Sequence, residues 1–515
     1  MYNVNPANTT NASLLAGTGV TLAQIWDYKC RHHGETPDYF ADAETAEDSP
    51  SGANNLVTTK DVTSAGRGQK VNFRNSSGYY GEGKRAEALF TASTDFEQNT
   101  LMEYPAYVNV FRNATSANEF TTETNAYRDE IENGVPQKLG AWLDRLKTET
   151  IDVRVRDTSH SSSLFTANSK GVAGLLSSDV LDVNNMLTVS GYLSTLGGRP
   201  AVVAKGKETI SKWVFGPTTE VVTTLQAQSD YQTLWRQSNT GIDYILKGEV
   251  ATIGNQIVRP YNVINHDGNG AIGSARLPMG RLSVAIAAGT AALTVYFGGT
   301  PNATNDTTKL YSKHFLGYAY TWLTGVTGEV LTSNPIIGGT DFTTKKYLMI
   351  VNPPNPGGSY VANGVGYYEY TTGNNGNAIT CTKRLSATGG VFGGTNTAVA
   401  TFTTSGSITP TLVATYGATF AEDHPVDAMI YQCNVRGVPL GFTPVYGAGG
   451  ILRPYGLHRL KRGMEMEEDG FMARTYLRSY FGTQLRKDNA SRTPSVGCIA
   501  HAVKFPYHTL PNVTA

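Results

Sequence analysis

The chain has 515 residues, which is too long for a single hydrophobic core and predicts two to four domains. Lysine plus arginine and aspartate plus glutamate each number 42, so the formal net charge is zero, and charged residues make up only 16% of the chain. Such a neutral composition argues against a dedicated nucleic-acid binder, which would show a basic excess, and favours a protein that associates with copies of itself.

The sequence shows no signal for a membrane or for export. No apolar run reaches the roughly 20 residues that a membrane helix needs. Residues 1–6 lack the basic start and apolar core of a signal peptide. Synthesis in the cytoplasm is therefore expected.

Residues 1–60 are rich in Asn, Thr, Gly and acidic residues and show no apolar periodicity, so an extended arm is predicted. Residues 61–120 predict a long two-stranded excursion, with one strand at 68–74 and a return strand at 104–111. The polar, Gly-rich stretch between them is too long for a tight turn. A hairpin with so few apolar residues is not stable alone and is expected to lie on a neighbouring subunit.

Several charged and aromatic residues of this excursion are candidates for contacts between subunits. They are Lys70, Phe73, Arg74, Lys84, Arg85, Tyr104 and Tyr107. Residues 78–85 nearly match a phosphate-binding loop, but Arg85 stands where a hydroxyl should hold magnesium, and no buried strand precedes the motif. We interpret it as a Gly-rich loop tip whose Lys84 and Arg85 meet carboxylates of a neighbour.

Residues 119–158 predict a helix, interrupted at Gly134 and Pro136. Thr121 or Thr122 is the expected cap at its start. After the break an apolar stripe follows at helical spacing, formed by Leu139, Trp142, Leu143 and Leu146. A second helix is predicted at 178–196, with Ser178 as its cap and Gly197 as its stop.

Residues 212–263 carry the most informative pattern of the chain. An apolar strand ends at Gly216, a short amphipathic helix and a turn follow, and two strands are predicted near 251–253 and 256–258. A further apolar stretch occupies residues 281–297.

Residues 315–415 have less charge and more Gly and Thr. Short strands at 347–351, 366–370 and 399–403, separated by turn clusters, predict an inserted β-sandwich. Mixed composition returns from 416, with strands predicted at 473–481 and 496–503. The dense but nearly balanced charges at 459–469 indicate a solvated face or a face between subunits.

No residue cluster predicts catalysis, a metal or a cofactor. The four cysteines, Cys30, Cys381, Cys433 and Cys498, lie far apart, so four independent thiols are expected. The histidines lack metal-binding spacing, and no serine or cysteine stands in a nucleophile motif. The sequence therefore predicts that the chain is not an enzyme.

The order of these elements, and residues 212–297 in particular, resembles the major capsid proteins of tailed bacteriophages. The resemblance covers about three quarters of the chain and rests on element order, since no sharp motif defines the family. It implies an α+β fold of the Hong Kong 97-like type, with an N-terminal arm, an extended β-hairpin loop, a peripheral domain with a spine helix and an axial domain. The β-sandwich-like insertion is a departure from that pattern.

The resemblance implies a division of the chain into seven parts. These are the arm (1–60), the extended loop (61–120), the peripheral domain with the spine helix (121–200), the axial domain (201–314), the β-rich, immunoglobulin-like insertion (315–415), the axial return (416–450) and the C-terminal part of the peripheral domain (451–515). Deleting residues 70–100 is then expected to abolish shell formation and to leave a folded monomer or capsomer.

The function implied is that of a structural protein that assembles into the icosahedral shell around the double-stranded DNA of a phage. Expected partners are further copies of the chain in hexameric and pentameric capsomers, portal and scaffolding proteins, a decoration protein, and packaged DNA by non-specific contact. Some relatives cross-link a lysine of the extended loop, for which Lys70 and Lys84 are candidates by position. The expected location is the virion. The alternative is an extracellular β-rich adhesin, tail-fibre or surface-layer protein, which the Gly/Thr/Asn richness favours and the predicted helices oppose.

Overall fold

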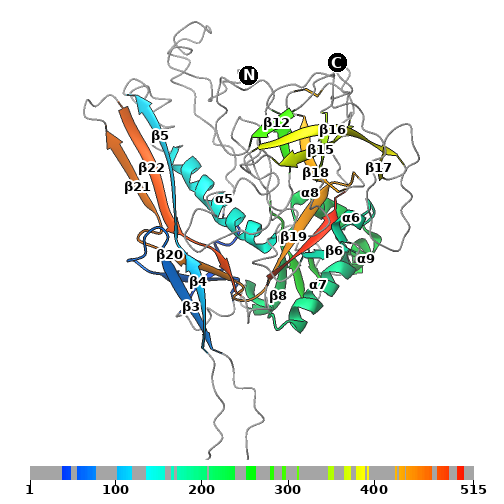
Figure 1. Ribbon diagram of the computed structural model, residues 1–515. Coiled ribbons are helices and arrows are strands. Elements are labelled where there is room, and N and C mark those ends of the chain that lie inside the picture. The colour runs from blue at the N-terminus through cyan, green and yellow to red at the C-terminus, as the bar shows by residue number, and fades with distance from the viewer. Residues whose placement is uncertain are drawn as a thin grey trace, which may run out of the picture.

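The computed structural model describes parts of the chain from residue 38 to residue 503 (Figure 1). The described residues are 38–47, 55–76, 101–118, 135–156, 164–167, 171–205, 208–237, 251–253, 255–261, 279–282, 293–296, 310–311, 346–352, 365–372, 378–388, 391–393, 424–425, 428–434, 437–466, 472–486 and 496–503. Within them, none of the helices has the length and apolar character needed to cross a membrane.

The first sheet joins segments from both ends of the chain. Its path runs β1-β2-β20-β22-β21, with β5 added beside β22 and β23 beside β20. The strands are β1 (Glu44–Ala46), β2 (Val57–Asp61), β5 (Asn109–Asn118), β20 (Ile451–Tyr455), β21 (Lys461–Met466), β22 (Met472–Phe481) and β23 (Gln484–Leu485). The long register from Asn109↔Phe481 to Asn118↔Met472 makes β5 and β22 one extended antiparallel pair.

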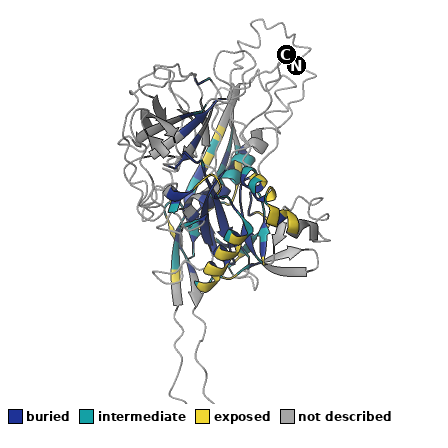
Figure 2. Ribbon diagram, turned by 90° about the vertical axis from the view of Figure 1, so that its right-hand side faces the viewer, coloured by how far each residue is buried: buried dark blue, intermediate teal, exposed yellow. Residues whose placement is uncertain are grey.

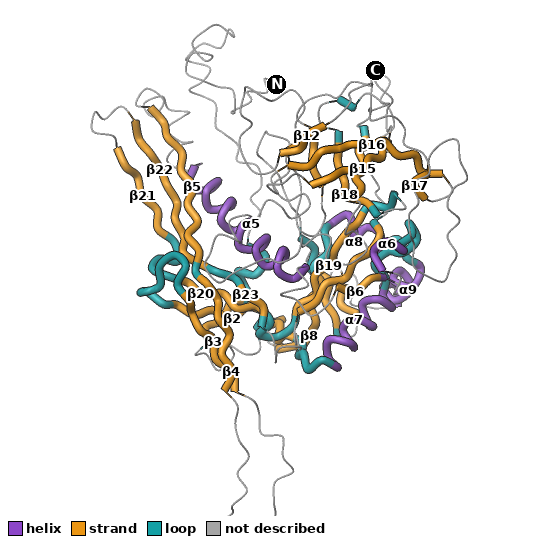
Figure 3. Tube along the Cα trace, viewed as in Figure 1, coloured by secondary structure: helices purple, strands orange, loops and turns teal. Residues whose placement is uncertain are grey.

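The helix α5 (Val135–Arg156) runs alongside β5 and β22 (Figures 1 and 3). Its apolar stripe meets the inner face of the sheet, where Leu139 and Leu143 share a buried cluster with Phe111, Leu477 and Phe481. The helix predicted after the break is confirmed, and it continues to Arg156 because the apolar pattern continues. The predicted part before residue 135, with its Thr121 or Thr122 cap, lies outside the described residues.

The predicted hairpin is present at its base. β3 (Lys70–Ser76) pairs antiparallel with β4 (Leu101–Tyr107), from Lys70↔Tyr107 to Ser76↔Leu101. In Figures 1 and 3 these two strands extend away from the rest of the molecule. The predicted return strand is divided at Val108, since β4 pairs with β3 and β5 pairs with β22. Residues 77–100 lie outside the described residues.

The second sheet has the path β6-β24-β19-β8-β10-β9, with β7 beside β8. The strands are β6 (Leu164–Thr166), β7 (Ala201–Lys205), β8 (Glu208–Phe215), β9 (Ala251–Ile253), β10 (Gln256–Val258), β19 (Leu440–Tyr446) and β24 (Val496–Ala502). The strand ending before Gly216 and the two short strands after it are as predicted. The last described strand, β24, lies between β19 and β6 in this sheet. The division of the chain into domains remains a proposal.

Four of the described helices belong to this half of the molecule. They are α6 (Gly171–Gly174), α7 (Val183–Thr195), α8 (Thr219–Gln226) and α9 (Ser229–Gln237). The buried faces of α7 and α8 cover the core around Trp213 and Phe215. Figure 2 shows the central strands as buried and outer helical faces as exposed.

The start of α7 differs from the predicted cap. Asp182, not Ser178, caps the helix, and its Oδ1 accepts from the backbone N–H of Asn185 at 2.6 Å. Residue 178 instead lies in a turn in which the Asp179 carboxylate accepts from the Leu176 N–H. The predicted stop is confirmed, because Gly197 has φ +94, a left-handed conformation that favours glycine.

In the described residues, the strands predicted for the insertion share one sheet with strands that lie outside residues 315–415. One sheet follows the path β12-β13-β11-β18-β14-β15-β16-β17, and an additional β12–β16 pairing closes it on itself. Its strands are β11 (Met279–Leu282), β12 (Leu293–Tyr296), β13 (Leu310–Tyr311), β14 (Lys346–Val351), β15 (Val365–Thr372), β16 (Ala378–Thr388), β17 (Val391–Gly393) and β18 (Met429–Cys433). Strands from 279–311 and 429–433 therefore join those predicted as a β-sandwich. Met349 and Val351 of β14 pack in one buried cluster with Tyr431 of the adjacent strand β18. Residues 399–403 lie outside the description.

The predicted arm also differs near its end. Tyr39 and Phe40 are buried in a cluster that includes Tyr446 and Ile451, and β2 pairs parallel with β20. The physical reason is the four apolar residues Tyr39, Phe40, Leu56 and Val57, which are too few to form a periodic pattern but bury completely. Residues 38–47 and 55–61 thus belong to the folded body.

Candidate assembly surface

The base of the β3–β4 hairpin is packed into the subunit itself. Val71 and Phe73 lie on one face of β3 and share a buried cluster with Ala106, Val108 and Leu452. Phe73 is fully buried, and the Lys60 ammonium lies 5.8 Å from its ring centroid. The described part of the hairpin is therefore anchored in a core of its own subunit.

The predicted contact residues are divided by this packing. Lys70 is exposed, whereas Tyr104 and Tyr107 are half-buried. Phe73 corrects the prediction, because alternation along β3 turns its side chain into the core of its own subunit, and it offers no surface to a neighbour. The side chain of Arg74 and residues Lys84 and Arg85 lie outside the described part of the chain.

Two close contacts hold the hairpin at its end. A Cβ added to Gly482 would lie 2.0 Å from the carbonyl oxygen of Tyr107, so only glycine allows the strands to approach here. The guanidinium of Arg486 lies 6.0 Å from the ring centroid of Tyr104. The end of β4 is thus fixed against the turn that follows β22.

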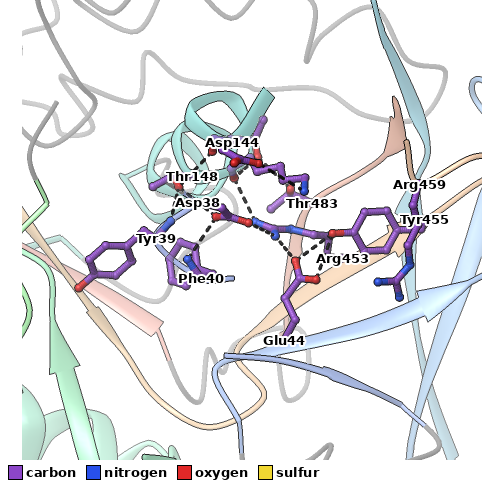
Figure 4. A network of polar contacts seen from close by, with 12 residues as sticks. Asp38, Tyr39, Phe40, Glu44, Asp144, Thr148, Arg453, Tyr455, Arg459 and Thr483 are labelled. Carbon is purple, nitrogen blue, oxygen red and sulfur yellow. Dashed lines mark hydrogen bonds and ion pairs between the residues drawn. The ribbon is translucent and has the colours of Figure 1, made fainter. Parts of the chain in front are cut away.

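A buried polar network joins three distant segments beneath the hairpin (Figure 4). Arg453 on β20 is fully buried and forms ion pairs with Asp38, at 2.9 Å, and with Glu44. Its Nη2 also donates to the carbonyl oxygen of Lys147 on α5 at 3.3 Å. The hydroxyl of Tyr455 donates to Glu44 Oε1 at 2.9 Å.

The backbone of the N-terminal segment takes part in the same network. The N–H of Tyr39 donates to Thr148 Oγ1 at 3.1 Å, and that hydroxyl donates to Asp38 Oδ1 at 3.1 Å. Asp38 Oδ1 also accepts from the N–H of Phe40 at 3.2 Å. The carboxylate therefore fixes the turn that brings two aromatic rings into the core.

The charges in this network support one another. Burial alone would lower the pKa of the Arg453 guanidinium, but Asp38, Tyr455 and Glu44 raise it above its ordinary value. Burial raises the pKa of the Tyr455 hydroxyl, and the positive charge of Arg453 opposes that effect. Arg453 stays charged and Tyr455 stays neutral at every physiological pH.

No metal centre competes with this interpretation in the part of the chain that the structure describes, where no group of three or more His, Cys, Asp or Glu residues is placed to hold an ion. Cys433 and Cys498 are buried, and burial raises the pKa of the Cys433 thiol well above its ordinary value. The buried network around Arg453 therefore has a structural role. It supports the base from which the β3–β4 hairpin and the long β5–β22 pair project.

Comparisons with known proteins agree with this architecture. The head structure of Helicobacter pylori bacteriophage KHP40 is similar at a TM-score of 0.50 and 11% identity, over 98% of this chain and 98% of that chain. The acid-stable capsid of Helicobacter pylori bacteriophage KHP30 gives a TM-score of 0.48 at 11% identity, over 97% and 99% of the chains. The capsid of Ralstonia phage GP4 gives 0.47 at 10% identity, over 93% and 95%.

No protein-family model matches the chain, and no curated protein matches its sequence. The likeness to the KHP40 head nevertheless spans nearly all of both chains. It confirms the predicted fold class, an α+β fold of the Hong Kong 97-like type. At 11% identity this likeness defines a fold, from which a function can be proposed.

Proposed function

We propose that the chain is the major capsid protein of a tailed bacteriophage and assembles into the icosahedral shell that encloses its double-stranded DNA. The single observation that supports this most is the likeness to a phage head over 98% of the chain. The projecting hairpin adds a physical reason, because elements that reach beyond their own subunit supply the burial that assembly needs.

The proposal includes partners and a location. Copies of the chain form hexameric and pentameric capsomers, since identical interfaces repeated around rotation axes close into rings and shells. Portal, scaffolding and decoration proteins complete the particle, and packaged DNA contacts the shell without sequence preference. The chain is made in the host cytoplasm, ends in the virion, and acts without catalysis. Nothing in the described residues favours the adhesin alternative.

The hairpin provides the test, and the structure refines the deletion to be made. Removing residues 70–100 would also remove Val71 and Phe73 from the subunit core. Replacing only residues 77–100 with Asn-Gly keeps the β3–β4 pairing, because Ser76 and Leu101 are directly opposed. We expect the purified variant to remain folded by circular dichroism and to form no closed shells by electron microscopy.

A matched control keeps the length of the hairpin. Arg67→Gln changes one exposed side chain in the turn before β3 and should leave shell formation intact. Closed shells from the shortened variant would overturn the assigned role of the hairpin.

A further inference from the structure

The first and second sheets are joined by a short, glycine-rich crossing. β19 of the second sheet continues through residues 447–450 into β20 of the first sheet, and all of these residues except Ala448 are glycine. Gly449 has φ +60, a left-handed conformation that favours glycine. In Figure 1 the first sheet lies on the left and the second on the right. The crossing itself therefore contributes few side chains that could fix how the two sheets are oriented.

The N-terminal part of the folded body contacts both sheets beside this crossing. Residues 38–47, which we call the strap, contain β1 and are followed by β2. Just before β2, the carbonyl oxygen of Asn55 accepts from the N–H of Gly449 at 2.6 Å, and that of Leu56 accepts from the N–H of Ile451 at 3.3 Å. The segment that follows the strap is therefore bonded directly to the crossing.

The strap is attached to the first sheet by buried groups. Asp38 and Glu44 form the ion pairs with Arg453 described above, and the side chains of Arg453 and Asp38 are 0% and 4% exposed. The strand β1 also pairs with β2, which pairs with β20. Salt screens a buried pair much less than an exposed one, so this attachment is fixed.

The strap is attached to the second sheet by an exposed ion pair. Asp42 Oδ1 lies 2.9 Å from Nη1 of Arg259, and the two side chains are 65% and 40% exposed. Arg259 directly follows β10, and its N–H donates to the carbonyl oxygen of Phe215 on β8 at 2.9 Å. Its guanidinium carbon lies 4.9 Å from the ring centroid of Tyr39, which points away from Arg453 in Figure 4. This attachment is open to water and salt.

Two aromatic rings of the strap contact the residue at which the crossing begins. The ring centroids of Tyr39 and Phe40 lie 6.3 and 5.0 Å from that of Tyr446, the last residue of β19. The Tyr446 hydroxyl donates to Asp152 Oδ1 on α5 at 2.5 Å. A displacement of the strap is therefore transmitted to the start of the crossing.

We propose that the strap is a conformational clamp that sets the orientation of the second sheet relative to the first. Its buried attachment is permanent, whereas the Asp42–Arg259 attachment opens and closes. Opening uncovers the Tyr39 ring, so the closed state dominates in the isolated subunit. The inference rests on the proposed function, in which one chain forms rings of both five and six copies. Neighbours meet at different angles in such rings, and a subunit with two orientations fits both.

The test measures the distance between the two sheets in the full-length subunit before assembly. Spin labels are attached to Thr188→Cys on α7, which packs on the second sheet, and to Lys461→Cys on β21 of the first. Cys30 and Cys381 are replaced by serine, since the other two cysteines are buried. Double electron–electron resonance should give one main distance and a minor second one. Arg259→Gln should raise the minor population by up to about fivefold, the factor that one exposed ion pair contributes.

Two further variants make the test specific. Asp42→Asn removes the same ion pair and should shift the populations in the same direction as Arg259→Gln. Arg459→Gln is the matched control, because its exposed pair with Asp61, and its position 4.3 Å from the Tyr455 ring centroid, lie within the first sheet. It should leave the distances unchanged. Raising NaCl from about 50 to about 500 mM should raise the minor population in the labelled chain and not in Arg259→Gln.

The outcomes separate the clamp from the proposed function. A single, unchanged distance in the labelled chain and in both strap variants overturns the clamp. An equal shift in Arg459→Gln also overturns it, because any exposed pair would then have the effect. If the populations shift as expected but the unaltered chain never forms shells, the clamp stands and the proposed function fails. Closed shells from a chain that shows only one distance mean the reverse.

Discussion

The guanidinium of Arg453 lies 2.9 Å from the carboxylate of Asp38, although the two residues are 415 positions apart, and both are buried. This ion pair joins the N-terminal segment to β20, and the bond from Arg453 to the Lys147 carbonyl adds α5. The spine helix, the N-terminal segment and the C-terminal strands therefore meet at one charged group, directly beneath the hairpin core.

Replacing Arg453 with methionine should destabilise the subunit strongly. The change leaves Asp38 and Glu44 without their cation, and breaking a buried pair in this way costs about 3–5 kcal/mol. The measurement is the urea midpoint of the purified subunit. Arg459→Gln is the control, because its pair with Asp61 is 49% and 53% exposed and contributes at most about 1 kcal/mol. If the two changes lowered the urea midpoint equally, the buried network would not be what holds the N-terminal segment with Asp38 and Glu44 in place.

Gly482→Ala should destabilise the junction of hairpin and sheet. The new Cβ would lie 2.0 Å from the Tyr107 carbonyl oxygen and 3.2 Å from Pro454 Cγ, so backbone must move, at a cost of about 1–3 kcal/mol. Thermal unfolding measures the effect. Gly140→Ala in α5 meets nothing within 4 Å and should instead stabilise by about 0.5–1 kcal/mol, since alanine favours a helix. A neutral Gly482→Ala would contradict the described approach of the two strands.

Stability should fall as the pH drops below about 6.5, because of His501. Burial lowers the pKa of His501 from 6.5 to about 4, against a backbone hydrogen bond at Ile499 that raises it. The folded state therefore favours the neutral ring, and this contribution is complete above pH 6.5 and is lost as the pH falls towards 4. By pH 4.5 the loss is about 2.5 kcal/mol.

Urea unfolding at pH 7.5 and pH 4.5 tests this in the unaltered subunit and in His501→Gln. The variant should lose much less stability between the two pH values. His458→Gln, which removes a half-buried histidine, should behave as the unaltered chain does. The same pH dependence in the unaltered chain and in His501→Gln would place the titrating group elsewhere.

Local patterns were sufficient for the elements that are regular and amphipathic. The stripe through Leu139 and Leu143 predicted α5 after the break, and glycine at 197 predicted the end of α7. The β3–β4 pairing followed from alternation on both strands. In each case neighbours in the sequence determine the conformation, so a single sequence is informative.

Pairings between distant segments could not be predicted in the same way. Nothing local in 109–118 indicates that it pairs with 472–481, and the burial of Phe73 depends on Leu452, which lies far along the chain. The same applies to 38–47, where Asp38 looks like a solvated acid until Arg453 is placed beside it.

The most direct test of the central proposal is to express the full chain, with and without candidate scaffolding partners, and to image the product by negative-stain electron microscopy. The account predicts closed shells or ring-shaped capsomers, because the chain shares its fold with a phage head along 98% of its length. Elongated fibres, or dispersed monomers under every condition, would contradict it.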